Sequence, residues 1–204
     1  MFAPGRVSFP LFCLAIAANV ARTEPRQTFS DDDARYLVWL LAFSLISELP
    51  YQLFFPSASS LNIFPTLAFG LVIAWGVHHQ WRFCRALAFT ACCLAYLLSE
   101  PLMYGFLGTL APAALVIAIK LRGFWWLLPA ALCASINASR DLLVGFSELQ
   151  LYPMIVLGIA FAAPLFGLWL LTVRPPMRIW PVRRWAYMFY PVHLLALQML
   201  RALI

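Results

Sequence analysis

The sequence predicts an all-α, polytopic transmembrane bundle of about eight helices, which forms a single integral-membrane domain over residues 1–204. Composition is the first observation behind this prediction. Of the residues, 64% are apolar and only 11% are charged, whereas an average soluble domain carries about 25% charged residues. The second observation is that apolar runs near the length needed to cross a bilayer recur along the chain.

The predicted helices follow one another with only short polar connections. Their ranges are Val7–Ala21, Tyr36–Phe54, Leu61–Val77, Cys84–Leu98, Leu102–Ile119, Phe124–Ile136, Leu149–Val173 and Trp185–Ile204. The first and sixth runs are short, and runs of roughly 10–14 residues also fit re-entrant or interfacial segments. A crossing must be helical, because lipid offers the backbone no hydrogen-bond partner. The alternation expected of a β-barrel strand is absent.

The loops between these helices differ in charge. If the helices alternate in direction, eleven of the fourteen basic residues fall on one face: Arg22, Arg26, Arg35, Arg82, Arg85, Lys120, Arg122, Arg174, Arg178, Arg183 and Arg184. The positive-inside rule assigns that face to the cytoplasm and both termini to the other side. The net charge of +6 is thereby explained by topology, without a nucleic-acid partner.

Several site classes find no support in the sequence. The five cysteines, Cys13, Cys84, Cys92, Cys93 and Cys133, lack metal-type spacing and are expected to be small, buried, free thiols. No Gly-rich phosphate loop, zinc pattern or nucleophile elbow is present. Asn137-Ala138-Ser139 matches a glycosylation acceptor, but a three-residue match has little weight. The aspartates of Asp31-Asp32-Asp33 predict a solvated loop that caps a helix starting near Tyr36.

A few polar residues fall inside the predicted helices, and these are the candidate site residues. His193 lies in the last apolar run, three residues after Tyr190, so both share a helix face on either side of Pro191. An ionisable group at membrane depth is costly and is usually retained for function. The alternative is a neutral imidazole that is hydrogen-bonded between packed helices. No metal site is predicted.

Three further candidates lie near helix ends. Glu48 precedes Pro50 and Tyr51, and Pro50 leaves a carbonyl of the preceding turn without its helical donor. The alternatives are structural: Glu48 can cap or snorkel to the interface, Arg6 can anchor the first helix there, and Asn62 can be a helix cap. The positions allow these groups to line one polar cleft through the bundle.

The same residues carry a family resemblance along nearly the whole chain. Gly5-Arg6-Val7-Ser8-Phe9-Pro10-Leu11-Phe12 resembles an element of the TraX family of conjugation-associated membrane proteins. Ser47-Glu48-Leu49-Pro50-Tyr51, the Asn62-led helix start and Tyr190-Pro191-Val192-His193-Leu194 resemble its later motifs. TrbP-like plasmid proteins are similar, as, more distantly, are polytopic acyltransferases that modify sugars.

The resemblance implies a multi-pass protein of the bacterial inner membrane that acetylates the pilin subunit of a conjugation system. Acetyl-CoA is then the acyl donor, membrane lipids surround the protein, and His193, Glu48 and Arg6 are the implied catalytic residues. Tyr190, Tyr51 and Asn62 are the implied substrate-binding residues. Family members begin with an earlier helix that bears an Asp-His pair. This chain starts after it, so either its start lies further upstream or the chain is a truncated and inactive relative; the external N-terminus inferred from loop charge favours a missing helix. No cleavable leader fits ahead of the first run.

Other functions stay open at this point. One is acyl transfer to a sugar or lipid head group, which the distant relatives suggest. Another is a non-catalytic membrane assembly factor for conjugation, or a small transporter, although the paired inverted repeats typical of transporters are not found.

Overall fold

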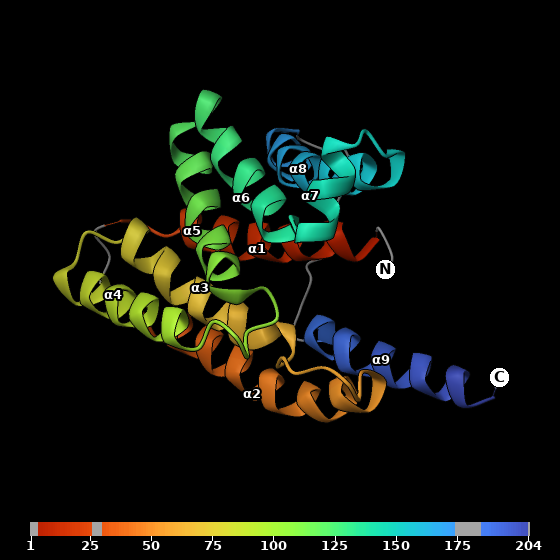
Figure 1. Ribbon diagram of the computed structural model, residues 1–204. Coiled ribbons are helices and arrows are strands. Elements are labelled where there is room, and N and C mark those ends of the chain that lie inside the picture. The colour runs from red at the N-terminus through yellow and green to blue at the C-terminus, as the bar shows by residue number, and fades with distance from the viewer. Residues whose placement is uncertain (1–3, 26–29, 174–184, 204) are drawn as a thin grey trace.

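The protein is described by a computed structural model, which covers residues 4–25, 30–173 and 185–203 (Figure 1). Within these ranges the chain forms nine α-helices and one 3-10 turn, without a strand. They are α1 (Pro4–Arg22), α2 (Asp31–Phe54), α3 (Ile63–His78), α4 (Arg82–Leu97), α5 (Gly105–Leu121), η1 (Gly123–Trp126), α6 (Leu127–Asn137), α7 (Arg140–Ser147), α8 (Leu151–Thr172) and α9 (Trp185–Leu203).

The predicted all-helical fold is confirmed. Each of the eight apolar runs corresponds to a helix, the sixth to η1 and α6 together, and α7 is a short helix that the apolar pattern did not predict. Among the described helices, α2 and α8 are long and apolar enough to cross a bilayer. Helices α3, α5 and α6 are apolar but shorter. Helix α9 continues through Pro191.

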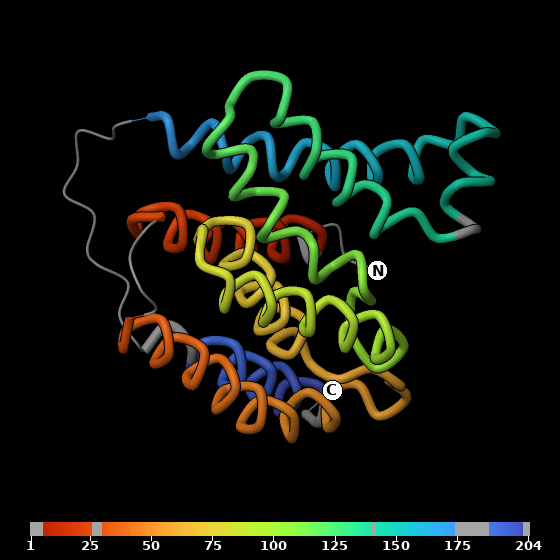
Figure 2. Tube along the Cα trace, turned by 90° about the vertical axis from the view of Figure 1, so that its left-hand side faces the viewer, coloured from red at the N-terminus to blue at the C-terminus, as the bar shows by residue number. Residues whose placement is uncertain are grey.

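The helices are arranged in three tiers (Figure 2). Helices α2 and α9 run side by side in the lowest tier, and α1, α3 and α4 lie above them. Helix α8 forms the uppermost tier with α6 and α7, and α5 crosses between the upper and middle tiers. Because α9 packs against α2, two motifs that are far apart in the sequence become neighbours.

Helix α3 lies at the centre, and small residues let its neighbours approach closely. A Cβ added to Gly70 would lie 2.7 Å from Pro112 of α5. Gly76 faces Ala88 of α4 so closely that an added methyl group would collide. Such contacts between small residues are typical of membrane helices, which pack without a hydrophobic drive between them. The close packing on both sides fixes α3, and with it the position of its first residues.

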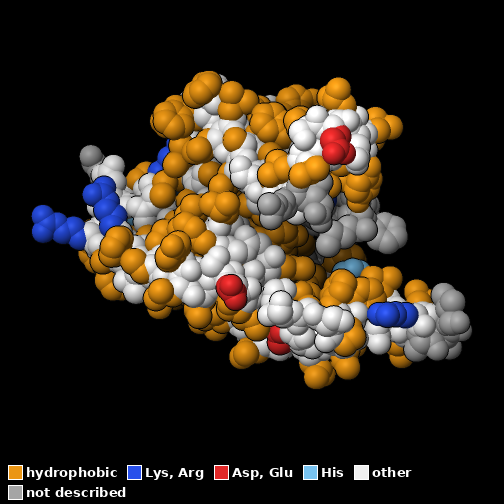
Figure 3. Space-filling model, in the orientation of Figure 1, with side chains coloured by type: hydrophobic (Ala, Val, Ile, Leu, Met, Phe, Trp, Pro, Cys, Tyr) orange, Lys and Arg blue, Asp and Glu red, His pale blue; other side chains and the backbone are white. Residues whose placement is uncertain are grey.

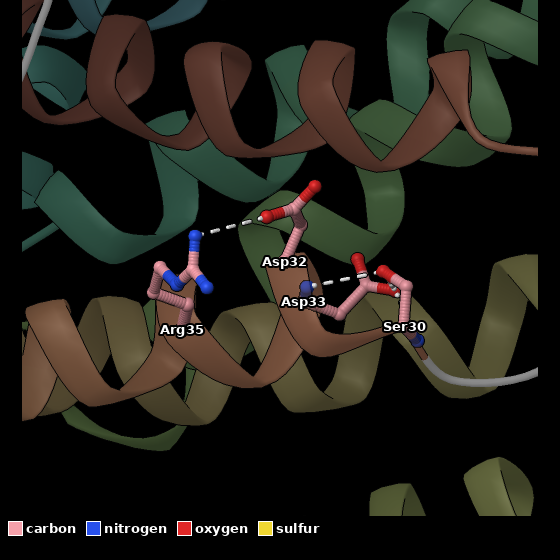
Figure 4. Close-up of polar contacts among 4 residues, drawn as sticks. All are labelled: Ser30, Asp32, Asp33 and Arg35. Atoms are coloured by element: carbon pink, nitrogen blue, oxygen red, sulfur yellow. Dashed lines mark hydrogen bonds and ion pairs between the residues drawn. The ribbon is translucent and has the colours of Figure 1, made fainter.

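Helix α2 begins earlier than expected. Ser30, and not the aspartate run, is its N-cap: the Ser30 hydroxyl accepts a hydrogen bond from the Asp33 amide at 3.2 Å (Figure 4). The Asp33 carboxylate accepts from the Ser30 amide at 3.1 Å, which completes a capping box. The predicted loop at Asp31–Asp33 was therefore wrong, since these carboxylates are stabilised within the first helical turn by the helix dipole.

The surface is dominated by hydrophobic side chains (Figure 3). Leu45 and Phe124, on helices from different tiers, are each 80% exposed. Soluble monomers rarely expose apolar patches larger than a few hundred Å². Exposed apolar side chains of this kind accord with the two helices, α2 and α8, that are long and apolar enough to cross a bilayer.

The cysteines follow the prediction only in part. Cys13, Cys84 and Cys133 are buried, as expected, but Cys92 is half-buried and Cys93 is exposed. The prediction was wrong for Cys93 because an apolar run does not tell which helix face meets the core. All five thiols are free.

Candidate functional site

The carboxylate of Glu48 lies at the centre of a polar cluster near the end of α2. One oxygen accepts hydrogen bonds from the Asn62 backbone amide at 3.1 Å and from Asn62 Nδ2 at 2.7 Å. The other oxygen accepts from Gln52 Nε2, one turn later on α2, at 2.7 Å. The half-buried carboxylate therefore accepts from three N–H donors, which compensates for its loss of water.

Asn62 is both a helix cap and a member of this cluster. Its Oδ1 accepts from the Phe64 amide at 2.9 Å and caps α3. Its Nδ2 donates to the Ser44 carbonyl at 2.7 Å as well as to Glu48. Asn62 is fully buried, and the structural alternative considered for it, a helix cap, is confirmed. The Ser44 carbonyl that it binds lies one turn before Glu48. The carbonyl that Pro50 leaves without its helical donor is that of Ile46, two residues later.

Two tyrosines adjoin this cluster. The Tyr51 hydroxyl lies 3.0 Å from Ser60 Oγ, within the loop that joins α2 to α3. Tyr190 of α9 packs edge-on against Phe64, with ring centroids 5.5 Å apart, and its hydroxyl hydrogen-bonds the backbone of Ile63. The start of α3 is thus the point where α2 and α9 meet.

His193 is half-buried on α9, one turn after Tyr190. Its Nδ1 lies 3.0 Å from the Tyr190 carbonyl oxygen, and its ring is parallel to that of Phe189, with centroids 5.4 Å apart. Since a carbonyl can only accept a hydrogen bond, Nδ1 must carry the proton. In the neutral ring the lone pair then lies on Nε2, so this contact selects the tautomer that takes up a proton at Nε2.

Arg6 lies in a second polar group, formed by α1, α5 and α6. Its Nη1 donates to Asn137 Oδ1 at the end of α6. Tyr104, the residue before α5, stacks on Phe9, one turn after Arg6 on α1, with ring centroids 3.9 Å apart. The Arg6 group is therefore built by residues of α1, the end of α6 and the residue before α5.

A groove of about 1390 Å³ opens between α1 and α2. Arg22, Asp32 and Arg35 line it where α1 ends and α2 begins, and Phe189 and Tyr190 line it where α9 meets α3. Between them the lining is mostly apolar and includes Leu11, Phe12, Leu14, Ala15, Ile16, Ala18, Asn19, Tyr36, Trp39, Leu40, Ile63, Phe64, Leu67 and Leu171. The groove therefore leads from a charged mouth to the edge of the tyrosine and histidine motif.

A family model described as TraX protein matches residues 1–201, which is nearly the whole chain. The chain belongs to the TraX family. Membership indicates a function related to conjugal transfer. No curated protein matches the chain, and no solved structure matches it.

Not all of the predicted site residues of this TraX-family chain lie together. Glu48, Asn62, Tyr51 and Tyr190 share one cluster, and His193 adjoins it through Tyr190. Arg6 lies apart, with Asn137 and Tyr104. A single polar cleft was expected, but the groove is mainly apolar and the polar groups flank its inner end.

Four contact residues were missed from the sequence: Gln52, Ser60, Tyr104 and Asn137. No sequence pattern marks Tyr104 or Ser60, because each contacts a residue of another element, Phe9 of α1 and Tyr51 of α2. In the sequence Asn137 stands out only as part of the glycosylation triplet Asn137-Ala138-Ser139. In the structure it is 4% exposed and hydrogen-bonded within the protein. Among the described residues, no three His, Cys, Asp or Glu side chains form a group that could hold a metal.

The ends of α1, α3 and α5 meet on one side of this TraX-family fold. His78 Nε2 lies 2.8 Å from the Thr23 carbonyl oxygen, and Lys120 Nζ donates to the His78 carbonyl at 3.3 Å. Figure 3 shows Lys and Arg side chains gathered mainly at the end of the molecule where α4 begins. The ends of α1, α3 and α5, which were predicted to share the basic face, are therefore neighbours. Five basic residues of that predicted face lie outside the described residues: Arg26, Arg174, Arg178, Arg183 and Arg184.

A buried histidine pair on this side predicts a pH-dependent stability. Burial lowers the pKa of both His78 and His79, and Lys120 lowers both further. The Thr23 carbonyl raises the pKa of His78, and Asp33 raises that of His79, but by less than burial lowers it. Below about pH 6.5 the unfolded chain then binds protons that the folded chain does not. The free energy of unfolding is expected to fall as the pH falls through this range.

Thermal unfolding in detergent from about pH 8 to about pH 5 measures this effect. His79→Leu should reduce the loss of stability on acidification relative to the wild type. An equal loss in both proteins would show that other groups cause it.

Proposed function

We propose that this protein is a multi-pass acetyltransferase of the bacterial inner membrane that acetylates the N-terminal amine of the pilin subunit, with acetyl-CoA as donor. The observation that carries the proposal is the position of Tyr190, which lies one turn before His193 on α9, lines a groove with an arginine-lined mouth and packs against Phe64. Phe64 lies at the start of α3, where Asn62 is hydrogen-bonded to Glu48. The exposed apolar surface supports the membrane location. The family resemblance supports the choice of pilin as acceptor.

The groove suits the donor in its chemistry. The pantetheine chain of coenzyme A is long and thin, and its phosphates are anionic, which matches an apolar lining with Arg22 and Arg35 at the mouth. From Arg22 to Leu11 the groove follows α1 for roughly 16 Å at 1.5 Å per residue. Arg35 pairs with Asp32 at 3.5 Å (Figure 4), but both side chains are exposed. Such a surface pair is worth about 0–1 kcal/mol, so Arg35 can turn to a phosphate.

Acetyl transfer forms a C–N bond and breaks the C–S bond of the thioester, so that coenzyme A leaves with the sulfur electron pair. The attacking amine must lose one proton, and the leaving sulfur finally gains one. His193 is the proposed base, because its Nδ1 contact with the Tyr190 carbonyl directs the lone pair to Nε2. The same imidazole then returns the proton to the leaving sulfur.

The remaining proposed site residues bind and orient the substrate. Glu48, held by Asn62 and Gln52, is the proposed hydrogen-bond acceptor for an N–H group of the neutral N-terminal amine. Arg6, which lies apart from this cluster with Asn137, is proposed to pair with a carboxylate of the substrate.

Mass spectrometry of pilin tests the proposal. Pilin from a strain with the intact gene should be heavier by one acetyl group, located at its N-terminus, than pilin from a strain that lacks the gene. Equal masses would remove the proposal. If acetylation of the surface glycan or a lipid head group differed instead, the acceptor would be a sugar or lipid and not pilin.

A further inference from the structure

Three side chains line the groove directly inside its arginine-lined mouth: Asn19 on α1, and Tyr36 and Trp39 on α2. Asn19 lies one turn before Arg22, and Trp39 lies one turn after Arg35, so each shares a helix face with the arginine of its own helix. Asn19 is exposed, and the two aromatic side chains are half-buried. One carboxamide, two aromatic rings and two guanidinium groups therefore border the same opening.

Trp39 offers an aromatic surface that is supported from the protein interior. Its ring packs against Phe43, one turn later on α2, with centroids 5.9 Å apart. Phe43 is 4% exposed and packs in turn against Phe64, with centroids 6.4 Å apart. This support reduces the conformational entropy that the indole would lose when a ligand stacks on it.

The side chains at the mouth match the chemistry of an adenine nucleotide. Aromatic rings such as those of Tyr36 and Trp39 bind nucleobases by stacking. The carboxamide of Asn19 has a donor and an acceptor, and adenine offers the complementary pair on its edge. Arg22 and Arg35 are exposed cations on two different helices, and guanidinium groups bind phosphate oxygens.

We propose that the mouth of the groove binds the adenine nucleotide end of coenzyme A. The base stacks on Trp39 beside Tyr36, and Asn19 forms hydrogen bonds with its edge. Arg22 and Arg35 bind the phosphates. The inference rests on the proposed use of acetyl-CoA as donor, and it adds the residues that distinguish this donor from a thioester without a nucleotide.

This placement of the nucleotide directs the other end of the donor toward the reacting groups. The apolar part of the groove is left to the pantetheine chain and leads to Phe189 and Tyr190. His193, the proposed base, follows Tyr190 by one turn on α9. Arg22 and Arg35 belong to the face that the loop charges assign to the cytoplasm, where coenzyme A is found.

Equilibrium dialysis with radiolabelled coenzyme A tests the site without acetyl transfer. Trp39→Leu keeps an apolar side chain but removes the π-face, so we expect the dissociation constant for coenzyme A to rise roughly 10-fold. Trp39→Phe restores a π-face and should retain most of the affinity. Trp125→Leu, at an indole that is 45% exposed on η1 and outside the groove, should bind like the wild type. Wild-type affinity in a folded Trp39→Leu protein would overturn the inference.

Competition on the wild-type protein provides a second arm, should Trp39→Leu fail to fold. Adenosine 3′,5′-bisphosphate should displace labelled coenzyme A, and inorganic diphosphate at the same concentration should not, because it lacks the base. Equal displacement by both would show that the mouth binds phosphate alone, and the inference would be wrong.

The failure of this inference and the failure of the proposed function give different results. Acetylated pilin together with binding that does not depend on Trp39 would remove the nucleotide site and leave the proposed function standing. Unacetylated pilin together with binding of coenzyme A that depends on Trp39 would remove the proposed function and support the nucleotide site.

Discussion

Replacement of His193 by alanine is expected to lower acetyl transfer by roughly 10²–10⁴-fold, the usual contribution of a general base. The reason is that Nε2 carries the lone pair when Nδ1 donates to the Tyr190 carbonyl. The rate is measured as the appearance of acetylated pilin with membranes that contain equal amounts of each variant. The protein should remain in the membrane, because His193 is only half-buried and its Nδ1 contact lies within its own helix.

His193→Phe is the matched control for packing. Phenylalanine preserves an aromatic ring against Phe189, whose centroid lies 5.4 Å from that of His193, but it cannot take up a proton. We expect this variant to be as inactive as His193→Ala and as stable as the wild type. Activity near the wild-type level in His193→Phe would show that the ring serves packing alone.

Replacement of Glu48 by glutamine is expected to destabilise the protein and to abolish acetyl transfer. Both carboxylate oxygens accept from N–H donors, of Asn62 on one side and Gln52 on the other. A glutamine amide must turn its NH₂ toward either Asn62 or Gln52. Two N–H donors then face each other there, and that hydrogen bond is lost. An unmade buried hydrogen bond costs about 1–3 kcal/mol, and the loss should appear as a lower free energy of unfolding in detergent.

Glu100→Gln is the corresponding control at an exposed carboxylate. It should change the free energy of unfolding by no more than about 0.5 kcal/mol, as surface substitutions usually do. If Glu48→Gln were as stable and as active as Glu100→Gln, the Glu48 cluster would have neither a structural nor a functional role.

The sequence predicted the helices well because apolar runs and helix-ending residues act locally. It also identified Glu48, Asn62, Tyr51 and Tyr190 as related polar residues, and these meet at the start of α3. Their shared position follows from the packing of α9 against α2. No local pattern predicts that pairing, so only the family resemblance connected these residues beforehand.

The Arg6 group shows what the sequence could not provide. Asn137 and Tyr104 become partners of Arg6 only because α1, α5 and α6 pack together, and neither has a distinctive local signature. The same limit explains Cys93, whose exposure depends on which face of α4 meets the core. The Ser30 N-cap was not predicted for a different reason: aspartate is about as favourable an N-cap as serine, and three aspartates directly follow Ser30.

Reconstitution of the full chain in lipid nanodiscs tests the central claim most directly. The protein is mixed with purified pilin subunit and acetyl-CoA that carries a deuterated acetyl group, and the pilin is analysed by mass spectrometry. The label should appear on the pilin N-terminus with the wild-type protein, and should be absent with the His193→Phe variant. Unlabelled pilin in the presence of the folded wild-type protein would contradict the assignment of acetyl transfer to this protein.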